Sequence, residues 1–138
     1  MDTDRVLSKR ILLVDDEQSV RQTIKLLLHF DQHIVTEARD GKEALALFAQ
    51  ETFDLVITDF AMPRMQGNEL AVRIKQLAPA QPIVMITAYA AQLGTAENPV
   101  DAVLNKPFGF QALRQTIKNV LSAENQAWSP ETRKAAIA

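Results

Sequence analysis

Short apolar runs recur along this chain, and segments in which apolar residues have helical spacing separate them. Runs such as 11–14 and 55–58 are too short for helices and show no polar alternation, which is typical of strands buried on both faces of a parallel sheet. The expected strands are 11–14, 33–38, 55–59, 83–87 and 102–105. Five strands that alternate with helices predict an α/β fold, a doubly wound five-stranded parallel sheet with helices on both faces and right-handed crossovers.

Four helices are expected between or after these strands from their apolar positions. The first follows Ser19, which is available as its N-cap, and the second spans 41–51. The apolar positions that mark the other two are Leu70, Ile74 and Leu77, and then Leu113, Ile117, Val120 and Leu121. A further helix between Tyr89 and Pro99 is expected to be short or irregular, because Gly94 and the turn pair Asn98-Pro99 lie in that segment.

The length of 138 residues suits one domain, which we expect to comprise a polar arm at 1–9, the folded domain at 10–123 and an extension or linker at 124–138. A net charge of −2 gives no general attraction to nucleic acid or anionic lipid, and no run approaches the roughly 20 apolar residues of a membrane span. The absence of cysteine fits a reducing compartment, so we expect a cytoplasmic protein without direct nucleic acid or membrane binding. A homodimer remains open.

Polar side chains follow the strands at the points where they end. Asp15 and Asp16 follow the first strand, Asp59 ends the third, Thr87 ends the fourth and Lys106 follows the fifth. In a sheet of order 2-1-3-4-5 the topological switch point lies between strands one and three, at the carboxyl ends, where ligands bind. The three acids are therefore expected to converge there.

Three converging carboxylates repel one another, and a divalent cation resolves that repulsion. Oxygen-only ligands suit a hard ion, and Mg²⁺ typically shares its remaining positions with water and phosphate oxygens. An aspartate can act as the nucleophile toward phosphorus, while a cation and a hydroxyl from Lys106 and Thr87 neutralise and bind the transferred group. The set predicts phosphoryl chemistry.

These motifs together resemble the receiver domain of two-component response regulators, over about residues 10–123. They are Asp15-Asp16, Asp59 followed by Met62-Pro63 and Gly67, Thr87-Ala88, and Lys106-Pro107-Phe108. The resemblance implies a flavodoxin-like fold like that of the chemotaxis regulators. It also implies a signalling domain that is not an enzyme in its own right but assists its own phosphoryl transfer and hydrolysis.

The resemblance further implies a role for each matching position. Asp59 would accept phosphate from a histidine kinase or phosphotransfer protein, and Asp15, Asp16, Asp59 and the backbone carbonyl of Ala61 would hold Mg²⁺. Thr87 and Lys106 would contact the phosphoryl group and couple it to the surface around strands four and five and the helix expected between them, which controls an output domain or partner. A cis peptide before Pro107 is also implied.

Departures from the family pattern leave an alternative open. The strand-five position that is commonly aromatic is Val103 here, and the segment between Thr87 and Lys106 is shorter than usual. Val103 favours, as an alternative, a phosphorylation-independent interaction module with a receiver fold, whereas the shorter segment implies an unusual surface around the helix expected between Thr87 and Lys106. A phosphatase that forms an aspartyl-phosphate would usually need an acid at the position of Ala61.

Three other polar residues are not assigned to the site. Glu17 is favoured in the first turn of a helix whatever its function. His29 and His33 lie at the opposite end of the first helix and the start of the second strand, so they are interpreted as structural or solvent-facing.

Overall fold

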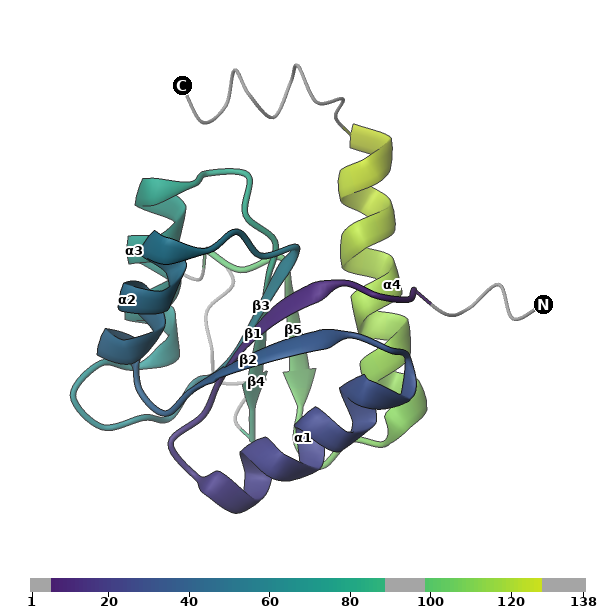
Figure 1. The fold of residues 1–138 in the computed structure, drawn as a ribbon, viewed down its shortest axis with the longest axis horizontal. Helices are drawn as coiled ribbons and strands as arrows, with labels where there is room; N and C mark the ends of the chain where they lie inside the picture. Colours follow the sequence, from purple (N-terminus) through teal and green to yellow (C-terminus); the bar gives the residue numbers. More distant parts are fainter. Residues whose placement is uncertain (1–5, 89–98, 128–138) are drawn as a thin grey trace.

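The computed structural model of the protein describes residues 6–88 and 99–127, with side chains as far as Ser122. The structure shows four helices and five strands in this part of the chain, and Figure 1 shows them in sequence colours. In chain order they are β1 (Arg10–Val14), α1 (Gln18–Phe30), β2 (Ile34–Ala38), α2 (Gly41–Gln50), β3 (Leu55–Asp59), α3 (Gly67–Leu77), β4 (Ile83–Thr87), β5 (Ala102–Asn105) and α4 (Phe110–Ala127).

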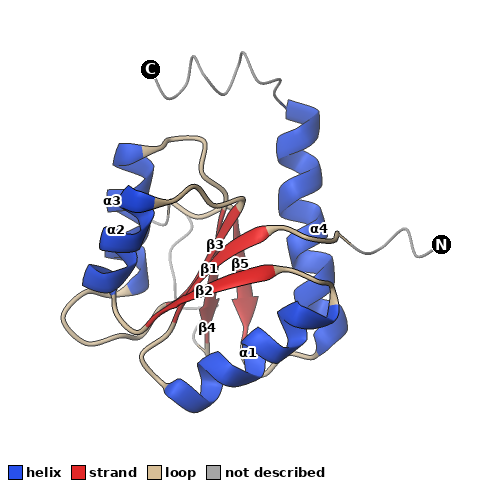
Figure 2. Cartoon of the chain, viewed as in Figure 1, coloured by secondary structure: helices blue, strands red, loops and turns tan. Residues whose placement is uncertain are grey.

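All five strands are parallel and lie in the order β2-β1-β3-β4-β5, which confirms the predicted fold class and topology. Helices α1 and α4 cover one face of the sheet and α2 and α3 cover the other (Figure 2). Ile11 and Leu13 contribute to the core beneath α1 and α4, whereas Leu12 and Val14 contribute to the core beneath α2 and α3. Such alternation explains why β1 reads as a continuous apolar run rather than as alternating residues.

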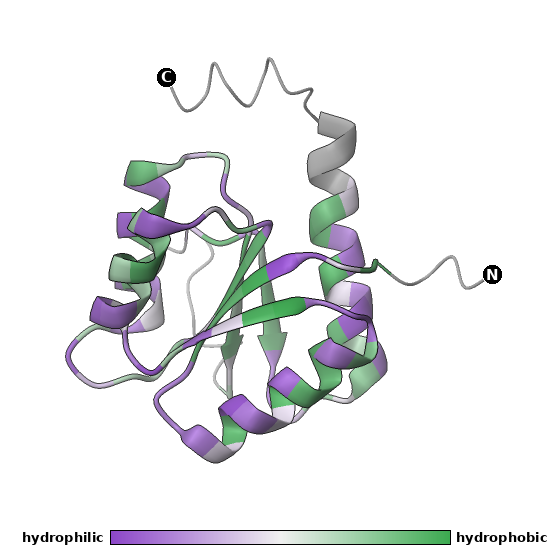
Figure 3. Cartoon of the chain, viewed as in Figure 1, coloured by the Kyte–Doolittle hydropathy of each residue, from purple (hydrophilic) through white to green (hydrophobic). Residues whose placement is uncertain are grey.

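The strands are therefore mostly hydrophobic in Figure 3, while the helices mix hydrophobic and hydrophilic positions. In α1, Ile24 and Leu28 are buried and Val20 packs beside them, as the helical spacing predicts. In α4, the fourth of the predicted helices, the whole predicted apolar set is buried: Leu113, Ile117, Val120 and Leu121. Residues at these spacings thus fix which face of each helix meets the sheet.

Two helix details differ from the sequence prediction. Helix α1 begins at Gln18 with Glu17 as the cap residue, so Ser19 lies inside the first turn and is not the N-cap. The helix begins two residues earlier than predicted because the Asp15 side chain accepts a hydrogen bond from the Glu17 N–H at 2.9 Å, which turns the chain there. Leu77 is 59% exposed rather than packed, because it is the last residue of α3 and lies beyond the buried turn.

The prediction of a short or irregular helix between Tyr89 and Pro99 falls almost entirely on residues 89–98, outside the described residues. Predictions about residues 128–138 lie outside them as well. Within the described ranges, no helix combines the length and the apolar character needed to cross a membrane.

Candidate functional site

The carboxyl ends of β1 and β3 bring three aspartates together. Asp15 and Asp16 follow β1, and Asp59 is the last residue of β3. One carboxylate oxygen from each lies within 4.8 Å of the others. Asp15 and Asp59 are buried, with exposed fractions of 2% and 6%, whereas Asp16 is exposed, so the cluster opens to solvent on one side.

One carboxylate oxygen of Asp15 is held by a hydrogen bond, and the other has no partner in the part of the chain that the structure describes. Its Oδ1 accepts the Glu17 N–H, whereas its Oδ2 is buried and has no hydrogen-bond partner among the described residues. Burial raises the pKa of Asp15 from 3.8 to about 6; the Glu17 N–H opposes this rise, and the negative charge of Asp59 adds to it. A buried, unpartnered carboxylate oxygen beside two more acids fits a hard divalent cation, which takes oxygen ligands. The predicted Mg²⁺ ligand set is therefore compatible with the structure.

Lys106 meets the cluster from β5. Its Nζ lies 2.8 Å from Asp59 Oδ1. Partial burial works to lower the pKa of Lys106, but the hydrogen bond with Asp59 and the negative charges of Asp59 and Asp15 outweigh it, so the pKa is raised. Lys106 is thus a fixed positive charge at the Asp59 carboxylate, and the Lys106–Pro107 peptide is cis, as predicted.

Thr87 and Ala61 flank this pair. Thr87 ends β4 and is 2% exposed, and its carbonyl accepts the Lys106 N–H at 2.8 Å, which fixes the two residues side by side. Ala61 lies two residues beyond Asp59 and is exposed. The role of each toward a phosphoryl group, and of the Ala61 carbonyl toward a metal, stays a prediction.

Gly67 supports Asp59 in a way that the sequence interpretation missed. The Phe60 N–H bonds to the Ile86 carbonyl, which extends the β3–β4 pairing, and the Gly67 N–H bonds to the Phe60 carbonyl at 2.8 Å. A Cβ on Gly67 would lie 2.3 Å from the Asp59 carbonyl oxygen, so only glycine permits this approach of α3. The sequence showed a glycine beside a turn, but nothing local indicated the backbone that it contacts.

Glu17 is the cap residue of α1 rather than part of its first turn, and the two histidines lie where the sequence interpretation placed them. The Glu17 N–H donates to Asp15 Oδ1, and the Glu17 side chain is exposed. His33 is buried and accepts the Lys9 N–H on Nδ1 at 3.0 Å, while His29 is exposed in the last turn of α1. Burial lowers the pKa of His33, so it is a neutral structural residue near neutral pH.

A family model described as the response regulator receiver domain matches residues 11–118. Among curated proteins, the probable transcriptional regulator ycf27 of Guillardia theta is 35% identical over 130 residues, covering 92% of this chain and 51% of that protein. The response regulator protein PilR of Pseudomonas aeruginosa is 35% identical over 133 residues, covering 94% of this chain and 29% of that protein. The chain therefore spans about half or less of the length of these relatives.

Solved structures show the same architecture. A response regulator receiver domain protein from Clostridium thermocellum superposes with a TM-score of 0.79 at 28% identity, covering 88% of this chain and all of that one. The response regulator TrrA of Thermotoga maritima, solved in complex with Mg²⁺-BeF, superposes with a TM-score of 0.77 at 34% identity, covering 82% and 99%. TrrA has also been solved in complex with the histidine kinase ThkA, with a TM-score of 0.75 at 34% identity, covering 82% of this chain and 98% of that one.

Proposed function

The chain belongs to the response regulator receiver domain family, and on that premise we propose that it is a phosphorylation-controlled switch whose acceptor is Asp59. The observation that carries the proposal is the pairing of this buried carboxylate with Lys106 at 2.8 Å, beside two further acids within 4.8 Å. Of the three acids, Asp59 alone leaves β3 into the loop that can face an incoming phosphorus.

In the proposed transfer, an Asp59 carboxylate oxygen forms a bond to phosphorus as the bond from phosphorus to the donor breaks, and the donor leaves with its electron pair. Lys106 stays at Asp59 throughout, where its charge offsets the negative charge of the transferred group. The Thr87 hydroxyl, delivered to the same edge by β4, donates to a phosphate oxygen. Phosphate on Asp59 then attracts the Thr87 and Lys106 side chains. Their movement shifts the surface around β4 and β5 from one preexisting conformation toward another.

Asp15, Asp16 and Asp59, with the Ala61 carbonyl, would hold Mg²⁺. When bound, the ion supplies neutralisation of charge on the transferring group and on the acid cluster. The unpartnered Asp15 Oδ2 supports this assignment, because a buried carboxylate oxygen is costly unless a donor or a cation satisfies it.

A histidine kinase or phosphotransfer protein is the proposed donor. The complex of the similar TrrA with the histidine kinase ThkA supports this class of partner. The curated relatives are longer than this chain, which supports control of an output domain or a separate partner protein. We place the exchange in the cytoplasm, where such kinases act on their regulators.

The test is incubation with MgCl₂ and acetyl phosphate, followed by intact-mass measurement. Wild type should gain one phosphoryl group, and Asp59→Asn should gain none. Glu69→Gln is a matched control, because Glu69 is an exposed acid on α3 whose loss should leave labelling unchanged. Excess chelator should suppress labelling of wild type.

Labelling of Asp59→Asn at the wild-type rate would show that another residue is the acceptor. A folded wild-type protein that gains no phosphate would favour the alternative, a phosphorylation-independent interaction module. The observation on the side of that alternative is Val103, which is 39% exposed on the edge strand β5 and has no ring to bury on activation.

A further inference from the structure

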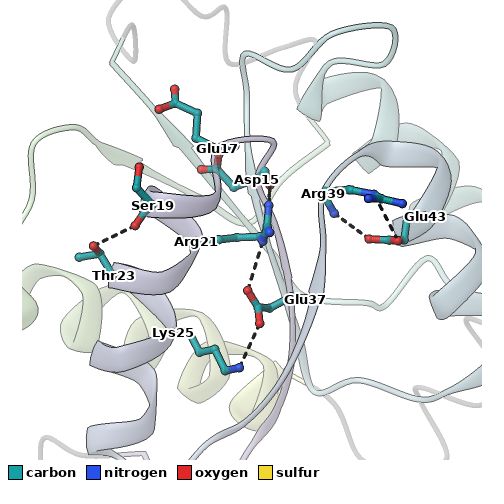
Figure 4. A network of polar contacts seen from close by, with 9 residues as sticks. All are labelled: Asp15, Glu17, Ser19, Arg21, Thr23, Lys25, Glu37, Arg39 and Glu43. Atoms are coloured by element: carbon teal, nitrogen blue, oxygen red, sulfur yellow. Dashed lines mark hydrogen bonds and ion pairs between the residues drawn. The ribbon is translucent and has the colours of Figure 1, made fainter.

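Arg21, on the second turn of α1, reaches back to the acid cluster through a backbone contact. Its Nη1 donates to the carbonyl oxygen of Asp15 at 2.7 Å, and its Nε donates to Glu37 Oε1 on β2 at 3.2 Å (Figure 4). The Arg21 side chain is only 15% exposed. The Arg21 guanidinium therefore links Asp15, directly after β1, to Glu37 on β2.

Glu37 is itself fixed in place. Its second oxygen, Oε2, accepts from Lys25 Nζ at 3.0 Å, one helical turn beyond Arg21. These contacts lower the pKa of Glu37, with the Lys25 hydrogen bond as the largest cause, so Glu37 is a stable carboxylate anchor. Figure 4 shows the four groups in a line from Lys25 through Glu37 and Arg21 to Asp15.

The contact with Asp15 matters because the Asp15 carbonyl belongs to the peptide that joins Asp15 to Asp16. The Asp15 N–H donates to the Ala38 carbonyl at 3.1 Å, so with Arg21 on the carbonyl both peptide groups of this residue are held. Neighbouring side chains of an extended strand point in opposite directions, and here the chain bends at Asp16, just beyond the end of β1. The peptide between Asp15 and Asp16 must have a defined orientation for an oxygen of each side chain to reach the same cluster. Arg21 fixes that orientation by donating a hydrogen bond to the carbonyl oxygen of this peptide.

We propose that Arg21, held by Glu37, is a positioning residue for divalent-cation binding, which sets the orientation of the Asp15–Asp16 peptide and hence of both carboxylates. This inference rests on the proposed function, because it assumes that the acids hold Mg²⁺. Arg21 acts through the backbone and contacts no reacting atom. Residues that orient metal ligands in this way contribute strongly to metal affinity.

Charge alone predicts the opposite behaviour. Arg21 is a cation near a cation site, so its simple electrostatic effect is to weaken binding of Mg²⁺. Loss of the Arg21 charge would then tighten binding, whereas loss of its positioning weakens it. The sign of the change in Mg²⁺ affinity therefore separates the two effects. If Arg21 only stabilised the fold, the Mg²⁺ affinity of its folded variants would be unchanged.

The experiment is isothermal titration of the full chain with MgCl₂, on variants whose folding is checked by circular dichroism. Arg21→Gln should weaken Mg²⁺ binding roughly tenfold. Lys25→Gln is the matched control, since it removes the same charge from the same helix and the same Glu37 carboxylate without a contact to Asp15. It should bind Mg²⁺ as tightly as wild type or more tightly.

Arg21→Lys is the second variant and decides the matter if Arg21→Gln fails to fold. It keeps the charge, but a lysine ammonium cannot reproduce the planar fork that reaches two acceptors in different directions. Weaker binding by Arg21→Lys supports positioning, and unchanged or tighter binding by the folded Arg21 variants overturns it. Failure of wild type to bind Mg²⁺ would instead overturn the metal role in the proposed function.

Discussion

Replacing Asp15 with asparagine should stabilise the metal-free protein and abolish most of its response to Mg²⁺. The Asp15 carboxyl group has a pKa of about 6 in the folded chain, against 3.8 for the group in the unfolded chain. Keeping such a group ionised in the fold costs about 3 kcal/mol of unfolding free energy, because each pKa unit corresponds to about 1.36 kcal/mol. An amide carries no charge, so this cost disappears.

The pH dependence gives the prediction its sign. A carboxyl whose pKa rises on folding contributes stability that is present below pH 3.8 and is lost as the pH rises through about 6. The stability difference between Asp15→Asn and wild type should therefore be small at low pH, grow across this window and level off above it. Subtracting the two proteins cancels the titration of groups that they share.

The assay is urea unfolding in excess chelator, at about pH 7 and at about pH 4. With an m value of about 2 kcal/mol/M, the full gain at neutral pH would raise the midpoint by about 1.5 M. Addition of Mg²⁺ should raise the midpoint of wild type and have little effect on Asp15→Asn.

Asp16→Asn is the matched control, because it removes the same charge from the next residue, which is exposed. It should also lose the Mg²⁺ response while gaining much less stability without metal. The reasoning fails if Asp15→Asn is no more stable than wild type at neutral pH. It also fails if Asp16→Asn gains as much, since burial would then not be the cause.

Three further outcomes follow from the geometry. Gly67→Ala should lower the free energy of unfolding by about 1–3 kcal/mol, measured by urea unfolding, because its Cβ would press on the Asp59 carbonyl. Arg114→Met should lower the free energy of unfolding by about 3–5 kcal/mol in the same assay, because the buried Asp31 carboxylate loses the guanidinium that contacts it at 3.0 and 3.1 Å. A loss below about 1 kcal/mol would contradict this. Ala61→Asn should speed phosphate loss from the labelled protein several-fold once donor is removed, because an amide two residues beyond Asp59 can orient a water, and an unchanged or slower decay would count against that account.

Strand positions were predictable because burial on both faces leaves a strong local signal. Runs such as Leu55–Asp59 are wholly buried, so neither face requires a polar residue and the pattern is read directly. The acids were predictable for a related reason, since parallel strands end at one edge and polar residues directly after apolar runs meet there. The strand order followed from the alternation of elements together with the resemblance to a known family.

The remaining features depend on individual side-chain contacts that spacing alone does not show, some local and some between residues far apart in the chain. The start of α1 was misplaced because the Asp15 side chain accepts the Glu17 N–H and turns the chain before Ser19. Nothing in local spacing links Arg21 to Glu37, sixteen residues away on β2. A neighbouring strand in register brings the two together, and registers are not visible in one sequence.

The pairing of β1 with β3 joins residues farther apart in the sequence than any other strand pair of the sheet, with Ile11 opposite Leu55. The pairs β1–β2, β3–β4 and β4–β5 join residues at shorter sequence separations. Closing that long loop is the most demanding step in bringing the two halves of the sheet together. Asp15 and Asp16 belong to one half and Asp59 to the other, so an ion bound by all three spans the junction. The ligand that prepares the acceptor would thereby also clamp the two halves of the fold, and two fragments divided between α2 and β3 would form the complete acid cluster only when they associate.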